Sequence, residues 1–188
     1  MHYLGLLATS VALSVTPPAV PTDLQVDAAY KPFLIARASG TQNYICLPSA
    51  TGVAWTLFGP QATLFDDDQR QVITHFLSAN PGENGTLRPT WQHSRDTSAV
   101  WGAAEATSSD AAYVAPGAIP WLKLRVMGAR TGPDDGDKLA SAKYIQRVNT
   151  AGGVAPSIGC SSPADIGRKA LVPYAADYVF YRNRADAE

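Results

Sequence analysis

Turn-forming residues recur about every ten residues along this chain, and the segments between them have the composition of β-strands. From Pro32 onward, no window of roughly 11–18 residues shows the 3.6-residue periodicity of an amphipathic helix. The candidate strands are residues 33–38, 42–47, 53–58, 62–65, 71–76, 90–93, 99–106, 119–127, 142–148 and 172–181. This spacing predicts an all-β, mostly antiparallel fold with few short helices, either a β-sandwich or a partly closed barrel.

Two of these segments indicate which face is buried. Within residues 119–127 apolar residues alternate with polar or larger ones at a period of two, at Leu122, Leu124 and Val126. Within residues 172–181 one face carries Tyr174, Ala176, Tyr178 and Phe180, which predicts a wall of the core. Residues 161–169 are predicted to hold one short helix, which Gly167 would end.

Composition limits the size of the fold and its partners. The chain has 188 residues, of which 46% are hydrophobic and 16% charged, so it can bury the core of one domain. Fifteen Lys and Arg residues against sixteen Asp and Glu residues give a net charge of −1. Nucleic-acid and anionic-membrane partners require a strongly basic surface, so we expect neither.

The N-terminal segment resembles an export signal. Residues 3–15 (YLGLLATSVALSV) are uncharged and apolar, and they are too few to cross a hydrocarbon core of about 30 Å. We predict that residues 1–21 are a signal peptide, or an apolar segment that packs on the domain, and that residues 22–188 form one β-rich domain. The mature protein is then secreted, in the periplasm or outside the cell, with no transmembrane span.

The two cysteines, Cys46 and Cys160, do not form a C-x-x-C pair and lack neighbouring zinc ligands. An even number of cysteines in an exported chain favours one disulfide. The alternative is a pair of buried free thiols.

Residues that could bind metals or catalyse hydrolysis are few. His75, His93 and Asp96 are the best metal-ligand candidates, but their spacing matches no known site, so we predict no metal. Residues 134–137 (DDGD) lack the spacing of a calcium loop, which favours a solvated turn. There is no G-x-S-x-G motif. Carboxylate pairs for glycoside hydrolysis would have to come from Glu83, Glu105, Asp96 and Asp177.

One polar segment rich in aromatic residues is the best candidate for a binding site. Trp91, His93, Arg95 and Trp101 combine flat rings with hydrogen-bonding groups, a composition typical of small-molecule and carbohydrate sites. Arg147 is a more distant candidate, because a guanidinium binds carboxylates or sulfates. The alternative is that Arg147 forms an ion pair with Asp96 or Asp177, that Asn149 bonds the adjacent turn and that the tryptophans pack in the core.

Several blocks of sequence occur together in a recognisable order. They are residues 40–46 (GTQNYIC), Trp55 with residues 60–65 (PQATLF), residues 89–91 (PTW), residues 116–122 (PGAIPWL), residues 144–156 (YIQRVNTAGGVAP) and residues 172–181 (VPYAADYVFY), with Cys160 between the last two. From about residue 22 to about residue 182 the chain resembles the DUF3455 family, exported bacterial and fungal proteins of unknown function. The resemblance implies a signal peptide and a bond between the two cysteines.

Some fungal relatives carry a malate dehydrogenase label, which the residues do not support. A dinucleotide site needs a G-x-G-x-x-G turn between a strand and a helix, and the chain has no such spacing. We therefore predict a non-catalytic binding or envelope-associated protein that takes a small molecule or glycan and needs no cofactor. The alternatives are a secreted hydrolase acting on a glycan or ester, and an assembly module that uses the apolar N-terminus.

Overall fold

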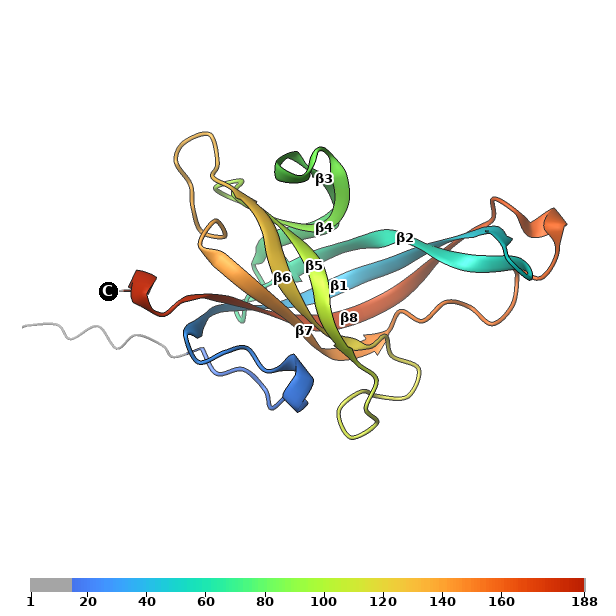
Figure 1. Cartoon of the computed structure of the whole chain (residues 1–188), viewed down its shortest axis with the longest axis horizontal. Helices are drawn as coiled ribbons and strands as arrows, with labels where there is room; N and C mark the ends of the chain where they lie inside the picture. The colour runs from blue at the N-terminus through green and yellow to red at the C-terminus, as the bar shows by residue number, and fades with distance from the viewer. Residues whose placement is uncertain (1–14, 188) are drawn as a thin grey trace, which may run out of the picture.

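The computed structural model describes residues 15–187, which form one closed antiparallel barrel of eight strands (Figure 1). Each strand pairs with the next along the chain, and the last pairs with the first. The strands are β1 (Tyr30–Ser49), β2 (Gly52–Phe65), β3 (Gln71–Asn80), β4 (Thr86–His93), β5 (Ala99–Ser108), β6 (Trp121–Arg130), β7 (Ala142–Gly152) and β8 (Lys169–Asn183). The predicted all-β antiparallel class is confirmed. The alternatives of a sandwich and a partly closed barrel are corrected to a closed barrel, because β1 pairs with β2 along one edge and with β8 along the other.

Four predicted segments merge into two long strands. Residues 33–38 and 42–47 both belong to β1, and residues 53–58 and 62–65 both belong to β2. Ser39-Gly40 and Gly59-Pro60, which have the composition of turns, lie inside these strands. At Gly40, β1 passes so close to β2 that a Cβ atom there would lie 2.5 Å from the Cα of Ala62. Gly40 therefore marks a close approach of two strands and not a chain reversal.

Strands β1, β2 and β8 extend beyond the other strands as a long arm (Figure 1). Near its end Cys46 of β1 is bonded to Cys160, which confirms the predicted disulfide, with Cα atoms 5.5 Å apart. The chain beside Cys160 holds only a single 3₁₀ turn, Pro163–Asp165, in place of the predicted helix. Ser162 and Asp165 cap this turn, and Gly167 N–H donates to Cys46 O at 2.9 Å, which returns the chain to the arm.

The main core fills the inside of the barrel. The face of β8 predicted to line the core is confirmed, since all four of its residues are buried there, namely Tyr174, Ala176, Tyr178 and Phe180. Leu124 of β6 and Ile145 of β7 pack in the same cluster, with Leu122 and Val126 against it. Interior positions of an eight-stranded barrel come from alternate residues of each strand, which is the periodicity that the sequence displays.

A second apolar cluster lies outside the barrel, over β6, β7 and β8. The chain before β1 covers it with Leu24, which follows Pro21 in a short 3₁₀ turn and is fully buried. Gln146 fixes this contact, because its Nε2 donates to Leu24 O at 2.6 Å and its Oε1 accepts from the Tyr181 hydroxyl at 2.6 Å. Most of the predicted signal segment, residues 1–14, lies outside the described residues.

Candidate functional site

The structure separates the predicted site residues into two groups. Trp91 and Arg147 line a cavity inside the barrel, whereas His93 and Arg95 line a second cavity near the β2–β3 turn. Trp101 is buried, with its Nε1 donating to Ser78 Oγ at 3.0 Å and the Arg130 guanidinium 5.7 Å from its ring. The five predicted residues therefore do not form one surface.

The barrel cavity has a volume of about 240 Å³. Its walls come from all eight strands and are mostly apolar or aromatic, with a few polar side chains among them. The lining residues used below are Gln42 of β1, His75 of β3, Trp91 of β4, Arg147 of β7 and Tyr178 of β8. A closed barrel of eight strands is just wide enough to hold one small ligand.

The cavity opens where β4 and β5 separate. The β4–β5 pairing ends at Thr90, which lies opposite Trp101. The preceding residue of β4, Pro89, has no N–H to donate. Residues 87–89 of β4 and 102–104 of β5 line the two sides of this opening. Leu57 and Leu87 lie at the cavity with 53% and 62% of their surface exposed, so an apolar rim leads inward.

Trp91 forms an aromatic wall of the cavity together with His75. The two rings are stacked, with centroids 4.3 Å apart, and Tyr178 meets Trp91 edge-on at 5.5 Å. Trp91 is only 1% exposed, so it lies inside the barrel and not on a binding surface of the molecule. The physical reason is register, because Trp91 lies opposite His75 on the inward face, and Gly102 across the sheet leaves room for its ring.

His75 is neutral in this setting. Burial is the largest effect on its imidazole and lowers its pKa to about 3, and the nearby Arg147 charge acts in the same direction. Its Nδ1 lies 2.8 Å from the carbonyl oxygen of Thr90. A carbonyl only accepts, so Nδ1 carries the proton and Nε2 is left as an acceptor.

Arg147 is a cation without a carboxylate partner among the described residues. Its Nη2 donates to Pro120 O at 2.8 Å, and no Asp or Glu of residues 15–187 forms an ion pair with it. Its charge lowers the pKa of Tyr178, although burial has the larger effect and raises that pKa. The predicted ion pair of Arg147 with Asp96 or Asp177 is therefore wrong. Asn149 Nδ2 donates to Asp177 Oδ2 at 2.8 Å, and not to the turn.

Three buried nitrogen atoms of the cavity residues have no hydrogen-bond partner in the described part of the chain. They are Nε2 of Gln42, Nε1 of Trp91 and Nε of Arg147. More than about nine in ten buried polar groups in proteins are paired, because an unpaired donor costs about 1–3 kcal/mol. Trp121 Nε1 and Arg182 Nε, on residues outside the cavity lining, are unpaired as well, so the feature specific to the cavity is that three unpaired donors belong to residues that line it.

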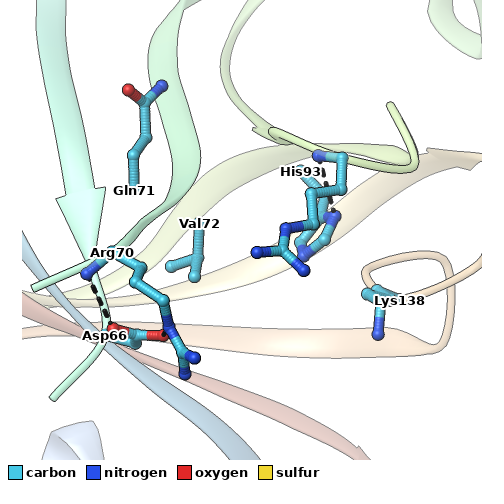
Figure 2. A pocket seen from close by; sticks show the side chains of 7 residues that line it. Asp66, Arg70, Gln71, Val72, His93 and Lys138 are labelled. Carbon is cyan, nitrogen blue, oxygen red and sulfur yellow. Dashed lines mark hydrogen bonds and ion pairs between the residues drawn. The ribbon is translucent and has the colours of Figure 1, made fainter. Parts of the chain in front are cut away.

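The second cavity, of about 200 Å³, is a polar depression near the β2–β3 turn. Figure 2 shows Arg70 bonded to Asp66 on one side of it and His93 on the other. His93 Nδ1 lies 3.0 Å from Asp96 Oδ1, and burial lowers the pKa of His93 despite that carboxylate. A paired His and Asp beside a cavity is a feature that the hydrolase alternative requires.

The arrangement around Asp96 does not match a catalytic triad. The Ser98 hydroxyl donates to Asp96 Oδ1 at 2.7 Å, so the carboxylate stands between the serine and the histidine. In a triad the histidine holds the middle position and takes the proton of the serine. Burial raises the pKa of the Asp96 carboxyl, but hydrogen bonds from Lys138 N–H and Ser98 together lower it by more, so the pKa lies below its ordinary value. Through the bond from Lys138 N–H, Asp96 anchors the loop at residues 131–138.

The other candidate carboxylates are paired with neighbouring side chains, and none of them lines the barrel cavity. Glu83 pairs with Arg88, and Glu105 pairs with Lys123. No cluster of three or more His, Cys, Asp or Glu side chains suited to a metal ion occurs within residues 15–187. Residues 134–137 are mostly exposed in the loop that Asp96 anchors.

Sequence reasoning missed Gln42 and Tyr178 as cavity residues, and it considered His75 only as a metal ligand. Tyr178 was assigned to the core face of β8, which is also the cavity wall. Gln42 carried a signal that was available, since a polar side chain at an inward position of a strand must satisfy its amide inside the barrel. The turn-like residues Ser39 and Gly40 divided the predicted strand and concealed that alternation.

Comparison with known proteins gives one match. The family model described as "Protein of unknown function (DUF3455)" matches residues 27–182, most of the chain. No curated protein and no solved structure matches it. None of the helices in the described part of the chain is long and apolar enough to cross a membrane. The matched region holds the disulfide, the cavity residues and every strand residue except Asn183, and the chain belongs to the DUF3455 family.

Proposed function

We propose that this protein is a non-catalytic binding protein that holds one small molecule inside its barrel. The observation that carries the proposal is the cavity of about 240 Å³ whose lining residues leave three buried donors unpaired. A site with mostly apolar walls and a few polar groups is the usual form of a small-molecule site. Drug-sized sites measure roughly 300–1,000 Å³, so this cavity suits a compact molecule better than an extended glycan.

We also propose that the protein acts outside the cytoplasm, in the periplasm or extracellular space. The Cys46–Cys160 disulfide supports this, because such bonds persist in oxidising compartments. The apolar run at residues 3–15 has the composition of a signal peptide.

Blocking the opening tests the binding site. Ala104 lines the mouth of the cavity and is exposed, so Ala104→Trp places an indole in the entrance. Ala112 is an exposed residue outside the cavity lining, and Ala112→Trp is the matched control. We expect a library of small aromatic and aliphatic fragments, followed by saturation-transfer NMR, to give binders of the wild type and the control that Ala104→Trp loses.

The proposal fails if no fragment binds the wild type. It also fails if the fragments bind Ala104→Trp as well as they bind Ala112→Trp. Circular dichroism of both variants establishes that each retains the β-rich fold.

A further inference from the structure

We propose that the ligand is a small organic anion, a compact apolar molecule bearing one carboxylate that Arg147 binds. This inference rests on the proposed function, since it names the chemical class of the molecule in the barrel cavity. It adds a charge and a specificity-determining residue to that function.

The cavity lining holds one positive charge without a counterion among the described residues. Two arginines line it, and Glu83 neutralises Arg88 through an ion pair of 2.8 Å. Arg147 has no such partner in residues 15–187, and no Asp or Glu lines the cavity. His75 is uncharged near neutral pH, so it does not compete for a negative charge. A partly buried guanidinium without a counterion is unfavourable, and an anionic ligand would remove that cost.

The unpaired donors of the cavity residues match the acceptors of a carboxylate. Arg147 Nε, Gln42 Nε2 and Trp91 Nε1 belong to three different strands that line the same cavity. A carboxylate has two oxygens with about four acceptor sites, and a guanidinium binds it through parallel N–H groups. One carboxylate therefore has enough acceptor capacity for all three donors. A phosphate dianion would call for more than the one free cation that the cavity lining supplies.

The remaining walls define the body of the ligand. Leu122, Leu124 and the Trp91 ring are apolar, and the exposed Leu57 and Leu87 form the rim. A cavity of about 150 Å³ with aliphatic and aromatic walls holds benzene. The present cavity of about 240 Å³ then accommodates a ring or short chain together with a carboxylate, a size represented by benzoate, phenylacetate and hexanoate.

The test uses matched pairs that differ only in charge. Benzoate, phenylacetate and hexanoate are titrated into ¹⁵N-labelled full-length protein, and their neutral amides, benzamide, phenylacetamide and hexanamide, are titrated in parallel. The side-chain ¹⁵N–¹H signals of Arg147 Nε, Trp91 Nε1 and Gln42 Nε2 report occupancy. We expect at least one acid to shift all three signals together, with a dissociation constant at least about tenfold lower than that of its amide.

Two arginine variants locate the charge. Arg147→Met removes the unpaired cation, while Arg125→Met removes an exposed arginine of β6 outside the cavity lining. We expect Arg147→Met to weaken binding of the acid about tenfold or more and to leave its amide nearly unchanged, and Arg125→Met to change neither. If Arg147→Met does not fold, Gln42→Leu is used instead, and it should also weaken binding of the acid selectively.

The outcomes separate the two proposals. If amides bind in the cavity as well as the acids, or better, the protein binds small molecules but the ligand is not an anion, and the present inference is overturned alone. If neither series shifts the cavity signals and no fragment binds, both proposals fail. If acids bind equally well to the wild type and Arg147→Met, the assignment of the charge to Arg147 is wrong.

Discussion

The imidazole of His75 lies flat on the indole of Trp91, with ring centroids 4.3 Å apart and planes 12° apart. The two residues are directly opposite each other in the β3–β4 ladder, and both face the inside of the barrel. The stack makes His75 part of the cavity wall while removing its ring from solvent, since the residue is only 2% exposed. The folded protein consequently keeps one histidine in its neutral form.

We predict that His75 makes the protein less stable in mild acid. In the unfolded chain histidine takes up a proton below about pH 6.5, whereas the folded pKa of about 3 keeps His75 neutral. The unfolded state therefore binds more protons between these values. The contribution of His75 to stability is complete above about pH 6.5 and is lost as the pH falls toward 3, by about 1.4 kcal/mol per pH unit. Urea unfolding at several values between about pH 7 and about pH 4 measures this slope.

His75→Phe is the control for this prediction, because it keeps a flat ring against Trp91 and removes the titrating group. Its free energy of unfolding should fall less steeply with decreasing pH than that of the wild type. Equal slopes in the two proteins would mean that His75 does not control the acid response.

We predict that Trp91 is a stability residue as well as a cavity wall. Trp91→Ala should lower the free energy of unfolding by about 3–5 kcal/mol, because it removes a buried ring that packs against His75, Tyr178 and Phe180. Trp55 is half-buried on the arm, and Trp55→Ala should cost about 1 kcal/mol. Denaturant unfolding of both variants provides the comparison, and a larger loss for Trp55→Ala would show that the arm, and not the barrel interior, limits stability.

We predict that the disulfide contributes strongly to stability. The two cysteines are 114 residues apart, and a loop of this length lowers the entropy of the unfolded chain by an amount worth up to about 5 kcal/mol. Reduction of the wild type and the double substitution Cys46→Ser/Cys160→Ser should lower the melting temperature by similar amounts. Thiol titration of the unreduced, unfolded protein should find no free cysteine, and detection of two free thiols would contradict the bond.

We predict that an alanine at position 40 destabilises the barrel. The added Cβ would overlap the carbonyl oxygen of Gln61 and lie 2.5 Å from the Cα of Ala62, which are backbone atoms that cannot turn aside. Overpacking of this kind costs about 1–3 kcal/mol. Gly82→Ala is the control, because the nearest atom to its Cβ is Asn80 Oδ1 at 3.5 Å. Gly40→Ala should have a lower melting temperature than Gly82→Ala in thermal unfolding. Equal melting temperatures would show that β1 and β2 move apart at position 40 without loss of stability.

The sequence allowed the strands to be predicted, because local alternation determines them, but not the closure of the barrel. Residues 99–106 and 142–148 match β5 and β7 within a few residues, since each has turn residues at its ends. Strands β1 and β2 were each divided in the prediction, at Gly40 and Gly59. A glycine that lets two strands approach and a glycine that begins a turn look the same in one sequence, because the difference lies in a partner far along the chain.

The candidate site was predicted by residue type more successfully than by arrangement. The proposals now centre on Trp91 and Arg147, which were both named from the sequence, whereas His93 and Arg95 line a different cavity. Residues close together in sequence were grouped on one surface. In a strand, however, the register with neighbouring strands determines what each side chain meets, and His75, the partner of Trp91, is sixteen positions away in the chain.

The pairing of β1 with β8 has a consequence for the order of assembly. These two strands share the longest register of the barrel, from Tyr30 opposite Asn183 to Ile45 opposite Lys169. During synthesis the outer edge of β1 has no neighbour until the final strand leaves the ribosome. A nascent chain that ends before Lys169 is an open sheet with two unpaired edges, and such edges readily pair with other chains. Protection against self-association is therefore acquired when β8 closes the barrel.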